Sequence, residues 1–199
     1  MNDFIIRAMN KNEAEAIAQV LAKGYFDDKF FHWVVDNEAD RLNVLEAYYS
    51  AYLTAPRAIV HVAESKTGSI IGTTVWLPHD VDPVLYENIN KAVGKYAPNF
   101  QAVADLSHDS EPTGTPFYQL VGFVVDKTCQ GLGVGTALLK YNLDDLDKKG
   151  IPTYLEASTE YHERSVYRKF NYERYGELMK FPNDILLYPL WRGVGDDNI

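Results

Sequence analysis

Apolar and polar positions along the chain follow two different spacings, and each spacing predicts its own kind of element. In residues 14–25 and about 39–52 the apolar residues recur at helical spacing, which indicates two amphipathic helices. Apolar runs bounded by turn residues indicate strands, and the tripeptide KTG between two such runs predicts a β-hairpin. Further helices are predicted at 83–96, 133–149 and 162–170. Strands are predicted at 4–9, 58–65, 69–78, 117–125, 151–158, 175–181 and 184–191.

Two stretches show no clean period. Residues 26–40 mix aromatic and acidic side chains, and residues 97–116 are rich in Pro, Gly, Asp and Ser, so we expect a long loop at 97–116. The predicted order β-α-α-β-β-α-β-α-β-α-β-β contains one strand–helix–strand crossover near 120–156. This order predicts an α/β (α+β) fold, in which helices cover both faces of a mixed sheet. The length of 199 residues suits a single domain over 1–199.

Charge and cysteine content narrow the classes of partner. The formal charge of −9 argues against nucleic-acid binding and favours a cationic small substrate over an anionic one, although solubility alone also explains this charge. No apolar run reaches the roughly 18–20 residues of a membrane span, and the first residues lack the apolar stretch of a secretory signal. The single cysteine, Cys129, fits a reducing compartment, so we expect a cytoplasmic protein without membrane partners. The five histidines show no metal-ligand spacing, and we expect no metal.

Three glycines at alternate positions separate a strand from a helix in residues 130–136. Glycines let the backbone turn sharply and approach a ligand, while the first turn of a helix offers free N–H groups and partial positive charge. Together they predict a phosphate site. A P-loop is excluded, because no lysine follows Gly135. A dinucleotide fingerprint is broken at Thr136, but Glu156 follows about 20 residues on, so a nicotinamide-dinucleotide oxidoreductase stays an alternative.

The same loop fits a third motif at every position. The run QGLGVG (130–135) matches Gln/Arg-x-x-Gly-x-Gly/Ala, and the sequence resembles the GCN5-related N-acetyltransferases (GNAT). The segments TVWLP, GIPTYLEAS and SVYRKFNY look like the puromycin acetyltransferase-like branch, so the resemblance covers about 59–199. It implies a GNAT fold with a mixed six- to seven-stranded sheet and a β-bulge or splay between the two central strands. Residues 1–58 would form the acceptor-side helices, and 117–172 the acetyl-CoA-binding core.

The resemblance also implies which residues act. Acetyl-CoA would be the donor, and a primary amine of a small molecule would attack its thioester directly. Tyr167 would be the general acid and would also touch the cofactor. The asparagine that many relatives carry before this tyrosine is absent, and either Ser165 or His162 takes its place. The implied cofactor-binding residues are Phe123, Val124, Val125, Gln130, Gly131, Leu132, Gly133, Val134, Gly135, Thr136, Ser165 and Tyr167.

The general base and the acceptor are less determined. Glu156, at the end of a predicted strand, would take the amine's proton directly or through a water, or else only anchor a loop or face solvent. Asp27 and Asp28 would attract an ammonium group, but an exposed helix end explains them as well. A CoA-binding sensor module without catalysis is a second alternative. The acceptor's identity and the choice between monomer and homodimer stay open.

Overall fold

The computed structural model describes residues 3–195, so residues 1–2 and 196–199 of the predicted domain lie outside the described part. The strands are β1 (Phe4–Ala8), β2 (Ile59–Ser65), β3 (Ile70–Pro78), β4 (Tyr118–Val125), β5 (Thr153–Ala157), β6 (Glu173–Arg174), β7 (Met179–Phe181) and β8 (Ile185–Arg192). The helices are α1 (Ala14–Tyr25), α2 (Lys29–Val34), α3 (Glu38–Leu53), α4 (Val84–Val93), α5 (Ala97–Ser110), α6 (Val134–Lys148) and α7 (Glu160–Ser165). Three short 3₁₀ helices, η1 (Gly94–Tyr96), η2 (Lys127–Cys129) and η3 (Tyr167–Phe170), complete the described elements.

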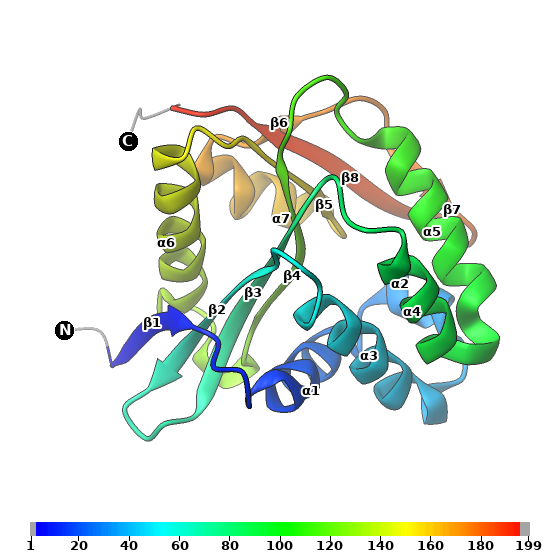
Figure 1. The fold of residues 1–199 in the computed structure, drawn as a ribbon, viewed down its shortest axis with the longest axis horizontal. Helices are drawn as coiled ribbons and strands as arrows, with labels where there is room; N and C mark the ends of the chain where they lie inside the picture. The colour runs from blue at the N-terminus through cyan, green and yellow to red at the C-terminus, as the bar shows by residue number, and fades with distance from the viewer. Residues whose placement is uncertain (1–2, 196–199) are drawn as a thin grey trace.

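An eight-stranded sheet runs through the middle of the molecule (Figure 1), in the order β1-β2-β3-β4-β5-β8-β6 with β7 paired to β8. Neighbouring strands are antiparallel except β4 and β5, which lie parallel across the crossover helix α6. The predicted mixed sheet is therefore confirmed. It has eight strands instead of six or seven, because β6 has only two residues and such a short strand leaves no sequence pattern.

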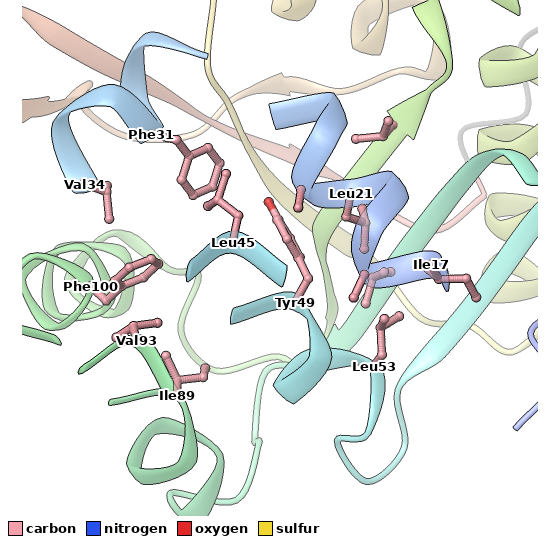
Figure 2. Packing of buried hydrophobic residues seen from close by; sticks show 14 of the residues in the cluster. Ile17, Leu21, Phe31, Val34, Leu45, Tyr49, Leu53, Ile89, Val93 and Phe100 are labelled. Carbon is pink, nitrogen blue, oxygen red and sulfur yellow. The ribbon is translucent and has the colours of Figure 1, made fainter. Parts of the chain in front are cut away.

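Helices cover both faces of this sheet, as predicted. Neighbouring residues of β3 show the two sides, since Val75 packs with α1 and α3 while Trp76 packs beneath α6. Figure 2 shows the first of these two cores, where Leu21 of α1 and Tyr49 of α3 converge. Leu139 of α6 belongs to the second core. Full burial of a leucine stabilises the fold by about 1.5–3 kcal/mol, so the two cores hold the central strands from both sides.

The prediction of a long loop over 97–116 is wrong, because Ala97–Ser110 forms the helix α5. Its side toward the cavity described below carries Gln101, Ala104 and Ser107. Phe100 is buried, and Val103 packs against the same core, so apolar residues do recur on the helix. The apolar stripe is narrow, because part of the inner face borders a cavity instead of a core. The sequence period is correspondingly weak, and residues 111–117 alone form the loop.

The stretch 26–40, which shows no clean period, contains the short helix α2. Asp28 caps this helix, since its carboxylate accepts the N–H of Phe30 at 2.9 Å. Phe31 and Val34 are buried. Six residues make fewer than two turns of helix, and this is too short for a helical period to stand out.

Candidate active site

The two central strands separate halfway along their length. Residues Tyr118–Leu120 of β4 pair with Thr153–Leu155 of β5, and beyond Leu120 the two strands no longer pair. The register against β3 also shifts at this point, because Val75 faces Gly122 while Trp76 faces Leu120, which leaves Val121 as a bulge. The predicted bulge and splay are thus confirmed. The far half of β4 consequently has a free edge, the kind of edge to which an extended ligand can add as a further strand.

A cavity of about 650 Å³ opens at this separation. One part of its lining comes from β4, the glycine loop and the start of α6, and another comes from α3, α4 and α5. The end of β5 and the segment around Tyr167 also line it, as do the end of α1, the start of α2 and Leu187 of β8. Ten of the twelve predicted cofactor residues and both predicted catalytic residues line this one cavity. Among residues 3–195, no lysine or arginine lines it.

The glycine loop makes the cavity wall next to α6. Gly131 and Gly133 have φ of +78° and +82°, a left-handed conformation that favours glycine. Gly133 caps α6 without any side-chain hydrogen bond, and the first N–H bonded within the helix is that of Ala137, which donates to the Gly133 carbonyl at 3.0 Å. The N–H groups of the first turn therefore stay available at the positive end of the helix dipole, which suits a phosphate group.

Gly135 is required for a different reason, the close approach of α6 to β4. A Cβ atom added at Gly135 would lie 3.0 Å from the ring of Phe123 and 3.4 Å from a methyl group of Val125. A side chain here would require either the Phe123 ring or the helix end to shift by a few tenths of an ångström. The loop is also tied to the strand by Gln130, whose Nε2 donates to the Val125 carbonyl at 3.1 Å.

A contact that the sequence did not predict joins Tyr25 to the free edge of β4. The Phe123 N–H donates to the Tyr25 hydroxyl at 2.9 Å, and this hydroxyl donates to the Phe123 carbonyl at 3.2 Å. Burial raises the pKa of Tyr25 to about 12, so the hydroxyl stays protonated and can donate. One side chain thus satisfies both backbone groups that Phe123 turns away from β3.

Tyr167 begins η3 and lies half-buried beside the separated strands. Its ring contacts the rings of Phe123 and Tyr172, with centroids 6.4 Å and 5.8 Å away. Burial, together with the nearby Tyr25, raises its pKa well above the usual tyrosine value. No hydrogen bond is among the causes of this shift, and the side chain borders the cavity. The hydroxyl is therefore a neutral donor that remains available to a ligand.

Glu156 lies near the end of β5, across the separation from β4. Its Oε1 accepts hydrogen bonds from the Ser107 hydroxyl of α5 and, at 3.2 Å, from the Tyr154 hydroxyl. Burial raises the pKa of Glu156, and the two hydrogen bonds oppose this effect because they favour the carboxylate. A carboxylate with a raised pKa is a stronger base than an exposed glutamate.

A second, half-buried carboxylate, Glu111, borders the same cavity, and the sequence did not predict it. Glu111 follows the last residue of α5, and its side chain is 16 % exposed. Burial and the charge of Glu156 raise its pKa to about 7. Its tract, HDSEPTGTP, has a linker-like composition, so no local pattern marks this residue as part of a site.

Several predicted residues lie elsewhere or have other partners. Leu132 and Ser165 are not among the cavity-lining residues, and the Ser165 hydroxyl donates to the carbonyl of Tyr161. Their cofactor contacts stay predictions. His162 does line the cavity. Asp28 caps α2, while Asp27 is exposed and pairs with Lys127 at 2.6 Å. Helix-end and surface roles therefore account for these two aspartates.

No helix within 3–195 combines the length and the apolar character that crossing a membrane requires. Within the same range, no three or more His, Cys, Asp or Glu side chains cluster so that they could hold a metal ion.

Comparison with known proteins identifies the family. A family model described as the acetyltransferase (GNAT) family matches residues 21–172, which is more than half of the chain. The chain therefore belongs to the GNAT acetyltransferases, a family that uses acetyl-CoA. No protein in the curated set that was searched matches the chain.

Solved structures share the fold across nearly the whole chain. A protein described as histone acetyltransferase HPA2 and related acetyltransferase, from Corynebacterium glutamicum, is 19% identical with a TM-score of 0.70, and the match covers 99% of each chain. An agmatine N-acetyltransferase mutant is 13% identical with a TM-score of 0.69, covering 97% of this chain and 100% of that one. Arylalkylamine N-acetyltransferase 2 from Aedes aegypti is 12% identical with a TM-score of 0.66, covering 98% and 100%. At these identities the likeness shows the fold alone.

Proposed function

We propose that this chain is an acetyl-CoA-dependent N-acetyltransferase that moves an acetyl group to the primary amine of a small molecule. One observation carries the proposal: Tyr167, Glu156 and the uncapped N-terminus of α6 all border one cavity at the separation of β4 and β5. A phosphate-binding helix end, a neutral proton donor and a buried carboxylate are the groups that the reaction needs in one place.

The residues at this cavity fit the donor. The left-handed turn at Gly131 and Gly133 leaves open space where side chains would stand, so a pyrophosphate can approach the first N–H groups of α6. The outward backbone groups of Phe123 and Val125 match the amides of a pantetheine arm, provided that Tyr25 and Gln130 release them. Acetyl-CoA supplies, when bound, an acetyl group activated as a thioester.

Two side chains would move the protons. Glu156 takes a proton from the ammonium of the acceptor, directly or through a water, and the free amine nitrogen forms a bond to the acetyl carbon. The carbon–sulfur bond breaks, its electron pair goes to sulfur, and Tyr167 protonates the thiolate. The nitrogen gives up a second proton, so each turnover releases one proton to solvent after Tyr167 is reprotonated. Holding amine and thioester in line supplies much of the rate.

The division of the chain belongs to the same proposal. Residues 1–58 form the acceptor side and 117–172 the acetyl-CoA-binding core of a single domain. Tyr25 and Tyr48, which line the cavity from the first of these segments, support this division. The similarity of the later segments to the puromycin acetyltransferase-like branch supports a small-molecule acceptor, and the single cysteine supports a cytoplasmic location.

Calorimetric titration with acetyl-CoA, with NADH and NADPH as controls, tests the proposal. Binding of acetyl-CoA alone, followed by release of free thiol with a primary amine, is the expected result. Absence of acetyl-CoA binding would overturn it. Binding without thiol release for any primary amine would favour a non-catalytic CoA sensor, and binding of NADH alone would favour an oxidoreductase. The broken dinucleotide fingerprint at Thr136 already counts against that last function.

A further inference from the structure

The charges around the cavity are strongly one-sided. Three acidic residues line it, namely Asp28, Glu111 and Glu156. Among the described residues 3–195, His162 is the one basic residue of the lining. The carboxylate of Asp28 is already engaged in capping α2. Two carboxylates, Glu111 and Glu156, are therefore left to face a ligand. A ligand that carries a carboxylate or phosphate beside its amine would meet no lysine or arginine there, so its charge would be repelled.

Glu111 needs a positive partner that its surroundings do not supply. Its nearest basic group is the ring of His108, whose Nδ1 is 3.7 Å away, beyond hydrogen-bond distance. That ring is 86% exposed, so it can add little to a carboxylate that is itself 16% exposed. Burial without a close cation is costly for a carboxylate, and its raised pKa of about 7 expresses this cost. An ammonium group that enters the cavity would relieve it.

Aromatic side chains surround the space near these acids. Tyr48, Tyr52 and Phe100 form one wall, where the two hydroxyl oxygens of the tyrosines lie 2.7 Å apart and the rings of Tyr48 and Phe100 are centred 4.6 Å apart. Tyr86 lines the same part of the cavity, and the charges of Glu111 and Glu156 both act on it. Aromatic faces attract cations and also cover methylene groups, so this wall suits a short alkyl chain between two ammonium groups.

We propose that the acceptor is an aliphatic diamine, whose reacting amine lies beside Glu156 and whose second ammonium group pairs with Glu111. The inference rests on the proposed function, because it names the acceptor of the same reaction. Two half-buried carboxylates would then be balanced by two positive charges, whereas a monoamine would leave Glu111 without an ammonium partner. An arylalkylamine would use the aromatic wall but would also leave Glu111 unpaired.

Three compounds of equal length test the role of the second charge. 1,4-Diaminobutane, pentylamine and 5-aminopentanoate share an aminobutyl group and differ only in the final ammonium, methyl or carboxylate. We expect kcat/KM for the diamine to exceed that for pentylamine by about 10- to 100-fold, the worth of a hydrogen-bonded charge pair. The aminopentanoate should be the poorest substrate. 2-Phenylethylamine serves as the aromatic comparison and should also fall below the diamine.

Glu111→Gln tests the assignment directly. The variant should lower the ratio of kcat/KM for diamine over pentylamine toward one. Asp109→Asn, the same change of charge on an exposed side chain at the end of α5, should keep the ratio of the parent protein. An unchanged acetyl-CoA affinity in both variants shows that they are folded. Equal values for diamine and pentylamine in the parent, a preference for 2-phenylethylamine, or a ratio unaffected by Glu111→Gln would overturn the proposal.

A binding readout separates this inference from the proposed function. Calorimetry with 1,4-diaminobutane on the protein saturated with CoA should show binding that weakens in Glu111→Gln and not in Asp109→Asn. If this result holds and no amine releases thiol from acetyl-CoA, the acetyltransferase function falls and the diamine site stands. If amines are acetylated but the diamine has no advantage in binding or turnover, the diamine site falls and the acetyltransferase function stands.

Discussion

The hydroxyl of Tyr25 bridges the N–H and the carbonyl of Phe123, at 2.9 Å and 3.2 Å. Tyr25 ends α1 and Phe123 belongs to β4, so one contact ties the proposed acceptor side to the strand proposed to hold the donor. A neighbouring strand, or an extended ligand in its place, would use the same two backbone groups. The hydroxyl therefore stands where the pantetheine arm is proposed to bind.

Tyr25→Phe should destabilise the free protein and tighten its binding of acetyl-CoA. Without the hydroxyl, the N–H and carbonyl of Phe123 lose their partner, and an unsatisfied group costs about 1–3 kcal/mol when buried. A bound pantetheine arm would satisfy both groups, so the cost would fall mainly on the free protein. Thermal unfolding should begin at a lower temperature, and saturating acetyl-CoA should raise Tm by more than in the parent.

Tyr141→Phe is a suitable control for this experiment, because Tyr141 is 46% exposed on α6 and does not line the cavity. Tyr141→Phe should change neither the Tm of the free protein nor the increase in Tm that saturating acetyl-CoA produces. If Tyr25→Phe and the parent show equal rises, the arm does not take the place of the hydroxyl, and Tyr25 is a structural tie between α1 and β4.

Tyr167→Phe should lower kcat by about 10²–10⁴-fold, the usual contribution of a general acid. The affinity for acetyl-CoA should change little, because the ring remains in contact with Phe123. Stability should also change little, since the ring contacts remain and no hydrogen bond is among the causes of the raised pKa of Tyr167. Steady-state kinetics, calorimetry and thermal unfolding measure the three effects. Full activity of the variant across the pH range would remove Tyr167 from the mechanism.

Those parts of the fold and site that depend on neighbouring residues were predictable from the sequence. The left-handed turn at Gly131 and Gly133 and the helix that follows lie within a few positions of each other. The strand pattern of 117–125 likewise predicts β4 without knowledge of its partners. The proposed role of Tyr167 rests on the family resemblance, because one tyrosine among 14 is not distinguishable by composition.

The contacts between distant segments were not predictable. Tyr25 and Phe123 are 98 positions apart, and Ser107 and Glu156 are 49 apart, so no local spacing relates them. Glu111 lies in a tract whose Pro, Gly and Ser content indicates a loop. Only the path of α5, whose inner face borders the cavity, brings that tract to the site. The same cavity weakened the apolar period of α5 and led to the wrong prediction of a loop.

Gly135→Ala should destabilise the protein by about 1–3 kcal/mol, the usual cost of overpacking. The added methyl group would lie 3.0 Å from the ring of Phe123, so either the ring or the end of α6 must shift. Acetyl-CoA binding should weaken as well, because the first turn of α6 carries the proposed phosphate site. A double-mutant cycle checks the cause, since Phe123→Leu removes the ring and should make Gly135→Ala less costly. If the losses of unfolding free energy of the two single variants, measured with urea, simply add in the double variant, the strain does not come from the Phe123 ring.

Ser107→Ala should move the acid limb of the kcat/KM profile to higher pH. The proposed base, Glu156, acts as a carboxylate, so activity falls as the pH drops through its pKa. Burial already raises that pKa, while the hydrogen bond donated by Ser107 opposes the rise because it favours the charged form. Without this bond the carboxyl group holds its proton to a higher pH. Activity should then be lost earlier on acidification and recover at alkaline pH.

Ser110→Ala is the matched control for Ser107→Ala. Its hydroxyl donates to the Leu106 carbonyl on the same helix, and the side chain does not line the cavity. Its profile should follow that of the parent. The charge of Glu156 acts on Glu111, so the acid limb of the profile reports the ionisation of both carboxyl groups together. The double variant Glu111→Gln with Ser107→Ala, in which Glu156 alone remains, should still show the shift to higher pH. A limb that stays in place when Ser107 is changed would mean that Glu156 is not the group whose ionisation limits the reaction.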